Sequence, residues 1–150
     1  MICLAVLLAA PFLTGAGAAD DGRFYAGAYS FSDEAGGFQI TGIAGTGTSE
    51  DPVVIMEDLP SASPVTLIVR ATRPVQPLSG DTAFANGILF LHFVVRNGSG
   101  QPWVAFEFEL QSEPGKPSVF SDGLSFDQRH ESPEAISCDR FSEHHTEFDP

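Results

Sequence analysis

Hydrophobic and polar residues alternate with a period of two through much of the chain, most clearly in residues 88–96 and 103–110. Alternation of this kind is typical of β-strands that bury one face. A six-residue turn sequence, N-G-S-G-Q-P, separates the two runs. The pattern therefore predicts a β-hairpin whose apolar faces coincide. Its expected cross-strand pairs are Val95 with Val104, Phe93 with Phe106, Leu91 with Phe108 and Leu89 with Leu110.

Shorter runs predict further strands at residues 24–31, 38–43, 53–56 and 65–70, and weaker ones on either side of an Asp122–Gly123 turn. Residues 73–85 contain two prolines and no clear period, which indicates a long connection. No segment shows the 3.6-residue period of an amphipathic helix. We therefore expect an all-β fold, namely an antiparallel β-sandwich of the immunoglobulin-like or jelly-roll-like kind. The charged end of the chain leaves open whether a final strand is missing.

The first 19 residues have a different pattern, because an almost unbroken apolar run is followed by the small residues T-G-A-G-A-A. This arrangement is typical of a cleavable secretory signal, although the usual early Lys or Arg is absent. The run is shorter than the roughly 20 apolar residues of a membrane span. A buried N-terminal helix or strand is the alternative. We predict a signal peptide at 1–19, a sandwich domain at 20–126 and an acidic, histidine-containing segment at 127–150, in a secreted or periplasmic protein.

The net charge of the chain limits the kinds of partner that it can bind. The formal net charge is -13, and all 20 acidic residues lie at or after Asp20. This excess of negative charge opposes binding to nucleic acid and to anionic lipid.

Signal cleavage would remove Cys3 and leave Cys138 as a lone thiol, without an internal disulfide. We expect Cys138 to be buried or unreactive, with a reactive or intermolecular thiol as the alternative.

Acidic pairs in or beside expected loops are candidate calcium ligands, because Ca²⁺ binds carboxylate and loop carbonyl oxygens. The candidate ligands are Asp33, Glu34, Glu50 and Asp51. No D-x-D-x-D-G motif accompanies them, so solvated acidic loops are the preferred interpretation. A second group of residues could hold Zn²⁺ or Cu²⁺, or could form a solvated tail. It comprises His130, Glu143, His144, His145 and Glu147.

The less apolar face of the expected hairpin carries the candidate ligand-binding residues. They are His92, Arg96, Trp103, Glu107 and Glu109. In the expected register a histidine faces a carboxylate, as in a proton-transfer or metal pair, or as in a simple cross-strand charge pair. The simple pair is preferred because no third ligand or nucleophile is placed beside it. Trp103 is suited to stacking on a sugar ring, or to a cation–π contact with Arg96.

Two segments resemble those of known exported proteins. Residues 45–55, G-T-G-T-S-E-D-P-V-V-I, are similar to segments that open domains in exported bacterial proteins, including some parallel β-helices. A β-helix needs stacked repeats, and none follows. Residues 103–110, W-V-A-F-E-F-E-L, followed by D-G-L-S-F at 122–126, resemble exported bacterial β-sandwich proteins. This resemblance implies an extracytoplasmic β fold and supplies no active site.

The sequence thus favours an exported, non-catalytic binding or structural domain with a carbohydrate or protein ligand. No G-x-S-x-G elbow or cysteine–histidine signature indicates nucleophilic catalysis. One alternative is a hydrolase of extracellular polysaccharide that uses Glu107 and Glu109 as its carboxylates. Another is a surface or adhesion module stabilised by Ca²⁺. Apart from Ca²⁺, we expect no cofactor.

Overall fold

A computed structural model describes residues 17–77, 80–126 and 136–141. The chain divides into two compact units, Met1–Gly100 and Gln101–Pro150, which are described separately. All regular elements in the described part are β-strands, so the prediction of an all-β fold is confirmed. That part contains no helix long and apolar enough to cross a membrane. Most of the expected signal sequence and most of the expected acidic segment lie outside the described residues.

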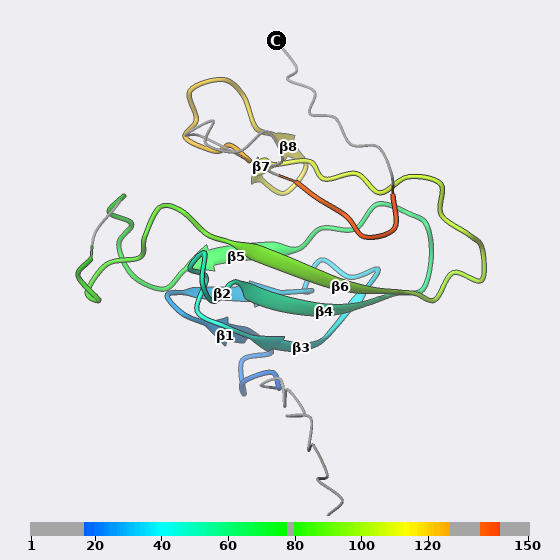
Figure 1. The fold of residues 1–150 in the computed structure, drawn as a ribbon, viewed down its shortest axis with the longest axis horizontal. Helices are drawn as coiled ribbons and strands as arrows, with labels where there is room; N and C mark the ends of the chain where they lie inside the picture. Colours follow the sequence, from blue (N-terminus) through cyan, green and yellow to red (C-terminus); the bar gives the residue numbers. More distant parts are fainter. Residues whose placement is uncertain (1–16, 78–79, 127–135, 142–150) are drawn as a thin grey trace, which may run out of the picture. The chain divides into compact units, whose positions relative to one another are not determined.

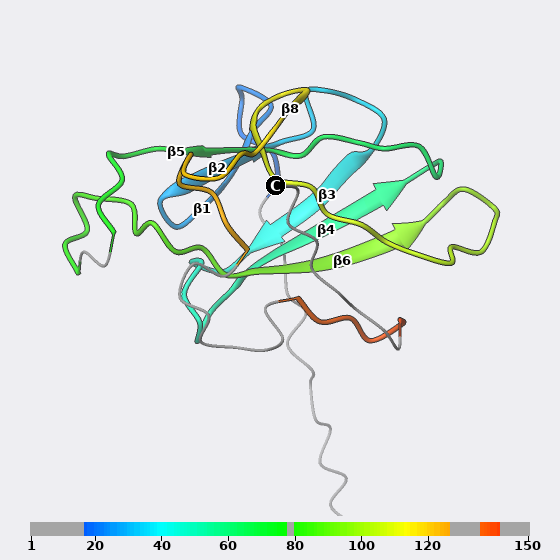
Figure 2. The same ribbon diagram turned by 90° about the horizontal axis from the view of Figure 1, so that it is seen from above.

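The first unit contains two three-stranded sheets (Figures 1 and 2). One sheet is antiparallel, in the order β1-β2-β5. Its strands are β1 (Phe24–Ala26), β2 (Tyr29–Ser32) and β5 (Ile68–Ala71). The other sheet, in the order β3-β4-β6, is mixed, because β4 is antiparallel to β3 but parallel to β6. Its strands are β3 (Gln39–Ala44), β4 (Val53–Leu59) and β6 (Leu91–Asn97).

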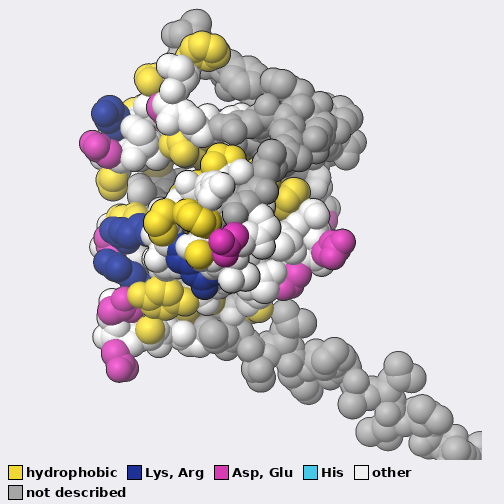
Figure 3. Space-filling model, turned by 90° about the vertical axis from the view of Figure 1, so that its left-hand side faces the viewer, with side chains coloured by type: hydrophobic (Ala, Val, Ile, Leu, Met, Phe, Trp, Pro, Cys, Tyr) yellow, Lys and Arg dark blue, Asp and Glu magenta, His cyan; other side chains and the backbone are white. Residues whose placement is uncertain are grey.

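The core of this unit consists of hydrophobic side chains from both sheets. They are Phe24, Ala26, Phe31, Phe38, Ile40, Ile43, Val53, Ile55 and Leu59, and the loop residue Ala85 is buried as well. Other hydrophobic side chains reach the surface, where they lie between acidic and basic ones on the side of the molecule shown in Figure 3. The mixed sheet shows that the expectation of a purely antiparallel fold was wrong. The arrangement of the sheets as a sandwich stays a prediction.

The expected hairpin does not form. β6 contains residues 91–96 of the first alternating run, with Phe93 and Val95 more buried than His92 and Val94, whereas residues 88–90 are in no strand. Its partner, however, is β4, in a parallel register of seven consecutive pairs from Val53–Leu91 onward. Residues 103–110 are in no strand. An alternating pattern fixes which face of a strand is buried but not which strand pairs with it, and β4 offers the more buried apolar surface.

Several other strand predictions need correction. The strand expected at 65–70 begins only at Ile68, and residues 118–126 are in no strand. The expected strand at 24–31 is a hairpin of β1 and β2, which turns at Gly27. Gly27 has a φ of 58°, and a Cβ there would lie 2.2 Å from the carbonyl oxygen of Thr46. Only glycine fits such a position without strain. In β4, the strand continues through Glu57 to Leu59 instead of ending at Met56, so that Glu57 lies on the buried face.

The second unit has little regular structure. β7 (Gln111–Glu113) and β8 (Lys116–Pro117) form a two-stranded antiparallel sheet. The ring of Phe106 contacts those of Trp103 and Phe108, with centroids 5.8 and 5.1 Å apart. The predicted turn at Asp122 is present, because its carboxylate accepts hydrogen bonds from the amides of Val119 and Leu124.

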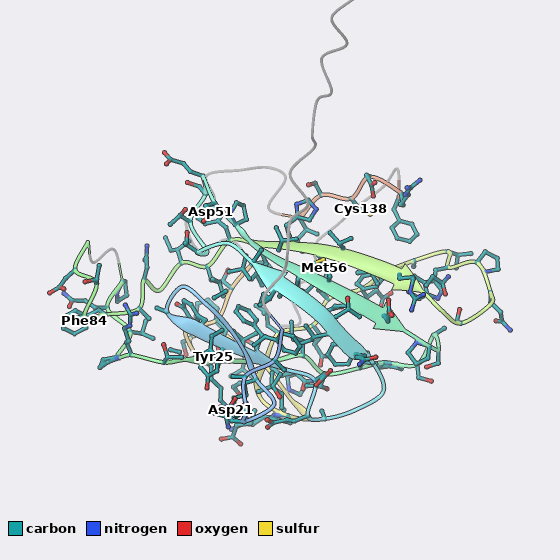
Figure 4. All side chains as sticks on the ribbon, turned by 90° about the horizontal axis from the view of Figure 1, so that it is seen from below. Asp21, Tyr25, Asp51, Met56, Phe84 and Cys138 are labelled. Carbon is teal, nitrogen blue, oxygen red and sulfur yellow. The ribbon has the colours of Figure 1, made fainter. Side chains whose placement is uncertain are left out.

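Cys138 is a free cysteine with an exposed side chain (Figure 4). Its sulfur accepts a hydrogen bond from the amide of Arg140 at 3.4 Å. Cys138 is therefore not buried, and the expectation that it is unreactive stays a prediction. An isolated cysteine gives no apolar periodicity from which its burial can be predicted.

Candidate functional site

An open cleft of about 660 Å³ lies at one end of the β3-β4-β6 sheet, where strands begin and end. Because β3 is antiparallel and β6 parallel to β4, the start of β3 and the ends of β4 and β6 meet there. The residues that line the cleft come from these three places. They are Gly37, Phe38, Gln39, Asp58, Leu59, Pro60, Arg96, Asn97 and Gly98.

An ion pair between Arg96 and Asp58 crosses the cleft wall from β6 to β4. The two residues are directly opposite in the parallel register. Arg96 Nε donates to Asp58 Oδ1 at 2.6 Å, and Nη2 donates to Oδ2, so the contact is bidentate. These bonds hold the pKa of Asp58 below its ordinary value and raise that of Arg96. The Arg96 side chain is 75% exposed, so the pair contributes little to stability and mainly fixes the position of the guanidinium.

The rest of the cleft combines an apolar base with polar side chains at its rim. Phe38 and Leu59 are buried hydrophobic residues. The amide side chains of Gln39 and Asn97 belong to exposed residues. The amide of Gly98 donates to the carbonyl oxygen of Leu59 at 2.8 Å and so ties the end of β6 to that of β4. A few convergent polar groups beside apolar surface are typical of small-molecule sites.

The outer face of the same sheet continues from the ion pair along β4 and β6. The register places Val54 beside His92 and Met56 beside Val94 on this face. Figure 4 shows Met56 on the sheet and Asp51 near the start of β4, at the other end of the strand from the cleft. Val94 is 49% exposed, so this face presents an apolar strip that ends at the cleft.

The predicted ligand-binding residues fall into two groups. His92 and Arg96 share one face of β6 in the first unit, whereas Trp103, Glu107 and Glu109 belong to the second unit. The expected pairs between these groups depended on the hairpin. Arg96 pairs with Asp58 instead, because parallel pairing brings that carboxylate beside it. Trp103 is half-buried, and its buried indole nitrogen has no hydrogen-bond partner within the described part of the chain.

Three of the four predicted calcium ligands have partners in the first unit. Asp33 Oδ2 accepts a hydrogen bond from the Ile40 amide at 2.9 Å. Glu34 forms an ion pair with Arg70 at 2.5 Å, and the bonds from Arg70 and Ser32 lower its pKa. Asp51 accepts a hydrogen bond from Thr46 Oγ1 at 2.9 Å, and Glu50 is exposed.

The hydrogen bonds and the ion pair of these carboxylates are the first observation that bears on metal binding. Across residues 17–77, 80–126 and 136–141 no group of three or more His, Cys, Asp or Glu is placed to hold a metal ion. The second predicted group lies outside the described residues. It comprises His130, Glu143, His144, His145 and Glu147.

We expect Ca²⁺ to stabilise the protein no more than Na⁺ does at equal ionic strength. Both ions screen the repulsion of a chain with a net charge of -13. A specific site would add stability that grows with ligand concentration, by about 2.7 kcal/mol at one hundred times Kd. Melting curves in CaCl₂ and in matched NaCl separate the two cases. A larger rise in Tm with CaCl₂ would contradict the expectation and restore the acidic loops as ligands.

Glu57 is a notable residue that the sequence analysis did not select. It is only 5% exposed and lies in register between Ile40 and Val95. No described residue forms an ion pair with its carboxyl group, and burial raises the pKa of that group to about 7. The apolar residues Val53, Ile55 and Leu59 stand at every second position around it, and this spacing is the signal that would have found Glu57, since position 57 belongs to the same buried face.

Comparison with other proteins does not assign this arrangement to a known group. No family model matches the chain, and neither a curated protein nor a solved structure shows significant similarity to it. The resemblance to exported bacterial β-sandwich proteins therefore stays a prediction. The inference of function has to come from the cleft and from the sheet that forms it.

Proposed function

We propose that the protein is an exported, non-catalytic binding domain that holds an uncharged, hydroxyl-rich ligand, such as an oligosaccharide, in the cleft. One observation carries this proposal. The only two ionisable side chains among the cleft residues, Arg96 and Asp58, are joined to each other above an apolar base.

The polar groups of the cleft fit hydroxyl groups of a sugar. Arg96 offers several N–H donors, Asp58 offers acceptors, and Gln39 and Asn97 offer both. Each sugar hydroxyl donates and accepts, so it can bond to such groups while the ion pair stays intact. A charged ligand would instead have to compete with one member of the pair for the other. Because the charges of Arg96 and Asp58 cancel, the cleft favours an uncharged ligand.

The same geometry supports binding over hydrolysis. Glycoside hydrolysis commonly uses two carboxyl groups, one of which keeps a raised pKa so that it can donate a proton. Asp58 is the single carboxylate among the cleft residues, and Arg96 lowers its pKa. Glu57 has a raised pKa, but it is buried on the opposite face of β4 and does not line the cleft. The cleft thus holds a carboxylate suited to accepting hydrogen bonds.

Replacing Arg96 is expected to weaken oligosaccharide binding by about tenfold or more, since hydrogen bonds to a charged group are worth about 1.5–3 kcal/mol. The measurement is a titration of the purified protein with neutral oligosaccharides, followed by backbone amide chemical shifts. Arg96→Met should reduce affinity and remove shifts at Gln39 and Asn97. Arg70→Met is the matched control, because Arg70 lies on β5 of the other sheet and forms its ion pair with Glu34, away from the cleft residues. Failure of the unaltered protein to bind, or equal binding by both variants, would refute the proposal.

Export is the second part of the proposal, and its support is the pattern of residues 1–19. We expect the mature protein to begin at Ala19 or Asp20. N-terminal sequencing of protein recovered from outside the cytoplasm tests this. Recovered protein that still began at Met1 would contradict cleavage.

A further inference from the structure

The last three residues of β4 connect the core of the first unit with the cleft. Asp58 projects from the outer face of the strand into the cleft wall, whereas Glu57 and Leu59 project from the buried face. Glu57 lies in register between Ile40 of β3 and Val95 of β6, so it is in the middle strand of the sheet. A movement that takes Glu57 out of the core therefore also moves the two cleft residues that follow it in β4.

The neighbours of Glu57 on its face of the sheet are apolar. Ile55 and Leu59 flank it on the buried face of β4, and Ile40 lies beside it on β3. Only 5% of Glu57 is exposed. Burying an ionised carboxylate without a partner is costly, because the charge loses its hydration.

The charged and titratable groups of the same sheet do not compensate this carboxylate. β3 has no ionisable side chain, and Asp33, which accepts a hydrogen bond from the Ile40 amide, is itself acidic. The remaining groups lie on the opposite face of β4 and β6, and two of them are bound to each other in the ion pair of the cleft. They are Asp58, His92 and Arg96.

The charged and titratable side chains of the other sheet have partners of their own. Tyr25 donates to Asp21, Tyr29 donates to the carbonyl oxygen of Asn86, and Arg70 pairs with Glu34. Burial is the one cause that raises the pKa of Glu57 to about 7, so none of these charges contributes to the change.

The contacts that close the end of β4 are exposed to water. The carbonyl oxygen of Leu59 accepts a hydrogen bond from the amide of Gly98, an exposed residue, at 2.8 Å. The guanidinium of the Arg96–Asp58 pair belongs to a side chain that is 75% exposed, so this pair adds little stability. Segments closed by solvent-exposed hydrogen bonds open locally at a smaller free-energy cost than global unfolding. Glu57 can thus reach water when this end of the strand opens.

We propose that loss of the Glu57 proton to water opens the end of β4 and disassembles the cleft wall, so that the cleft is a pH-sensitive site. At acidic pH the neutral carboxyl group stays in the core, and Asp58 and Leu59 keep their places. As the pH rises through neutrality, the ionised group favours the open form, in which it is hydrated. The consequence for a bound ligand rests on the function proposed above, whereas the opening itself does not.

The two pKa values of Glu57 set the size of the effect. In the open form the carboxyl group has its ordinary pKa of 4.5, whereas in the closed form burial raises the pKa to about 7. Between these values only the open form loses its proton, so the opening equilibrium increases with pH. It should increase by about tenfold from pH 6 to pH 8 and level off above that range.

Amide hydrogen exchange of the ligand-free protein tests the proposal. The protection factor compares the observed rate with the intrinsic rate at the same pH, which removes the direct effect of pH on exchange. We expect the protection factor of the Gly98 amide to fall about tenfold from pH 6 to pH 8, and to stay constant in Glu57→Gln. A constant protection factor in the unaltered protein would overturn the proposal, and so would an equal fall in Glu57→Gln.

A second amide of the same protein separates local opening from global unfolding. The Thr72 amide donates to the carbonyl oxygen of Ala28 at the end of the other sheet, at 2.9 Å. Its protection factor should not follow that of Gly98. An equal fall at Thr72 would indicate that the whole unit unfolds, and the proposal would be wrong.

His92→Gln is the matched control variant, because histidine side chains commonly titrate in this pH range and His92 lies on β6. The variant should keep the tenfold fall at Gly98. A fall that disappears in His92→Gln would assign the pH dependence to His92 and overturn the proposal. Since no ligand is present, failure of oligosaccharide binding would contradict the proposed function without changing these results.

Discussion

Phe31→Ala is expected to lower the free energy of unfolding by about 3–5 kcal/mol, the usual cost of truncating a fully buried phenylalanine. Phe31 is on β2, with Phe24 of β1 and Val69 of β5 on either side in register. It is completely buried and is the largest such side chain in the described part of the chain. Its removal leaves a cavity that the flanking strands cannot fill. Urea denaturation followed by circular dichroism measures the loss.

Phe120→Ala provides the control for this substitution. The same atoms are removed from a residue that is almost fully exposed, so the free energy of unfolding should change by less than about 0.5 kcal/mol. Similar losses for Phe31 and Phe120 would mean that the core has been assigned to the wrong residues.

The strands were more predictable from the sequence than their partners. Alternation located β3 and β6 to within a few residues, because the period of a strand is a local property. Pairing is not local. The partner of β6 is β4, whose residues precede it by 38 positions, and the nearer run at residues 103–110 gave an equally good apolar face. Local pattern alone therefore favoured the hairpin that the structure does not form.

The candidate site likewise depends on strand pairing that a local sequence pattern does not predict. Arg96 was selected from the sequence as a polar residue on an outer face, but Asp58 was not identified as its partner. The two meet only because β4 and β6 run parallel in one register. Phe38 and Gln39 join them because β3 starts where those strands end. A cleft built from three strand ends can be predicted only when the sheet order is known.

Glu57→Gln is expected to stabilise the protein above neutral pH by about 3 kcal/mol and to change little near pH 4.5. In the unfolded chain the carboxyl group ionises with its ordinary pKa of 4.5, whereas burial raises the pKa in the folded state to about 7. Below pH 4.5 both states are protonated, and this group imposes no ionisation penalty. Between these values only the unfolded state loses its proton, so stability falls as pH rises. Above about pH 7 both states are ionised, and the penalty stays constant.

The size of this penalty follows from the two pKa values, because each tenfold change in proton affinity is worth about 1.4 kcal/mol. Other carboxylates also change stability with pH, so the informative quantity is the difference in unfolding free energy between variant and unaltered protein. Urea denaturation at intervals from pH 4.5 to pH 8 should show that difference growing and then levelling off. Glu50→Gln removes an exposed carboxylate of the same chain and is measured at each pH as the control variant. A flat difference for Glu57→Gln would show that Glu57 is ionised in the folded state and has a polar partner or access to water.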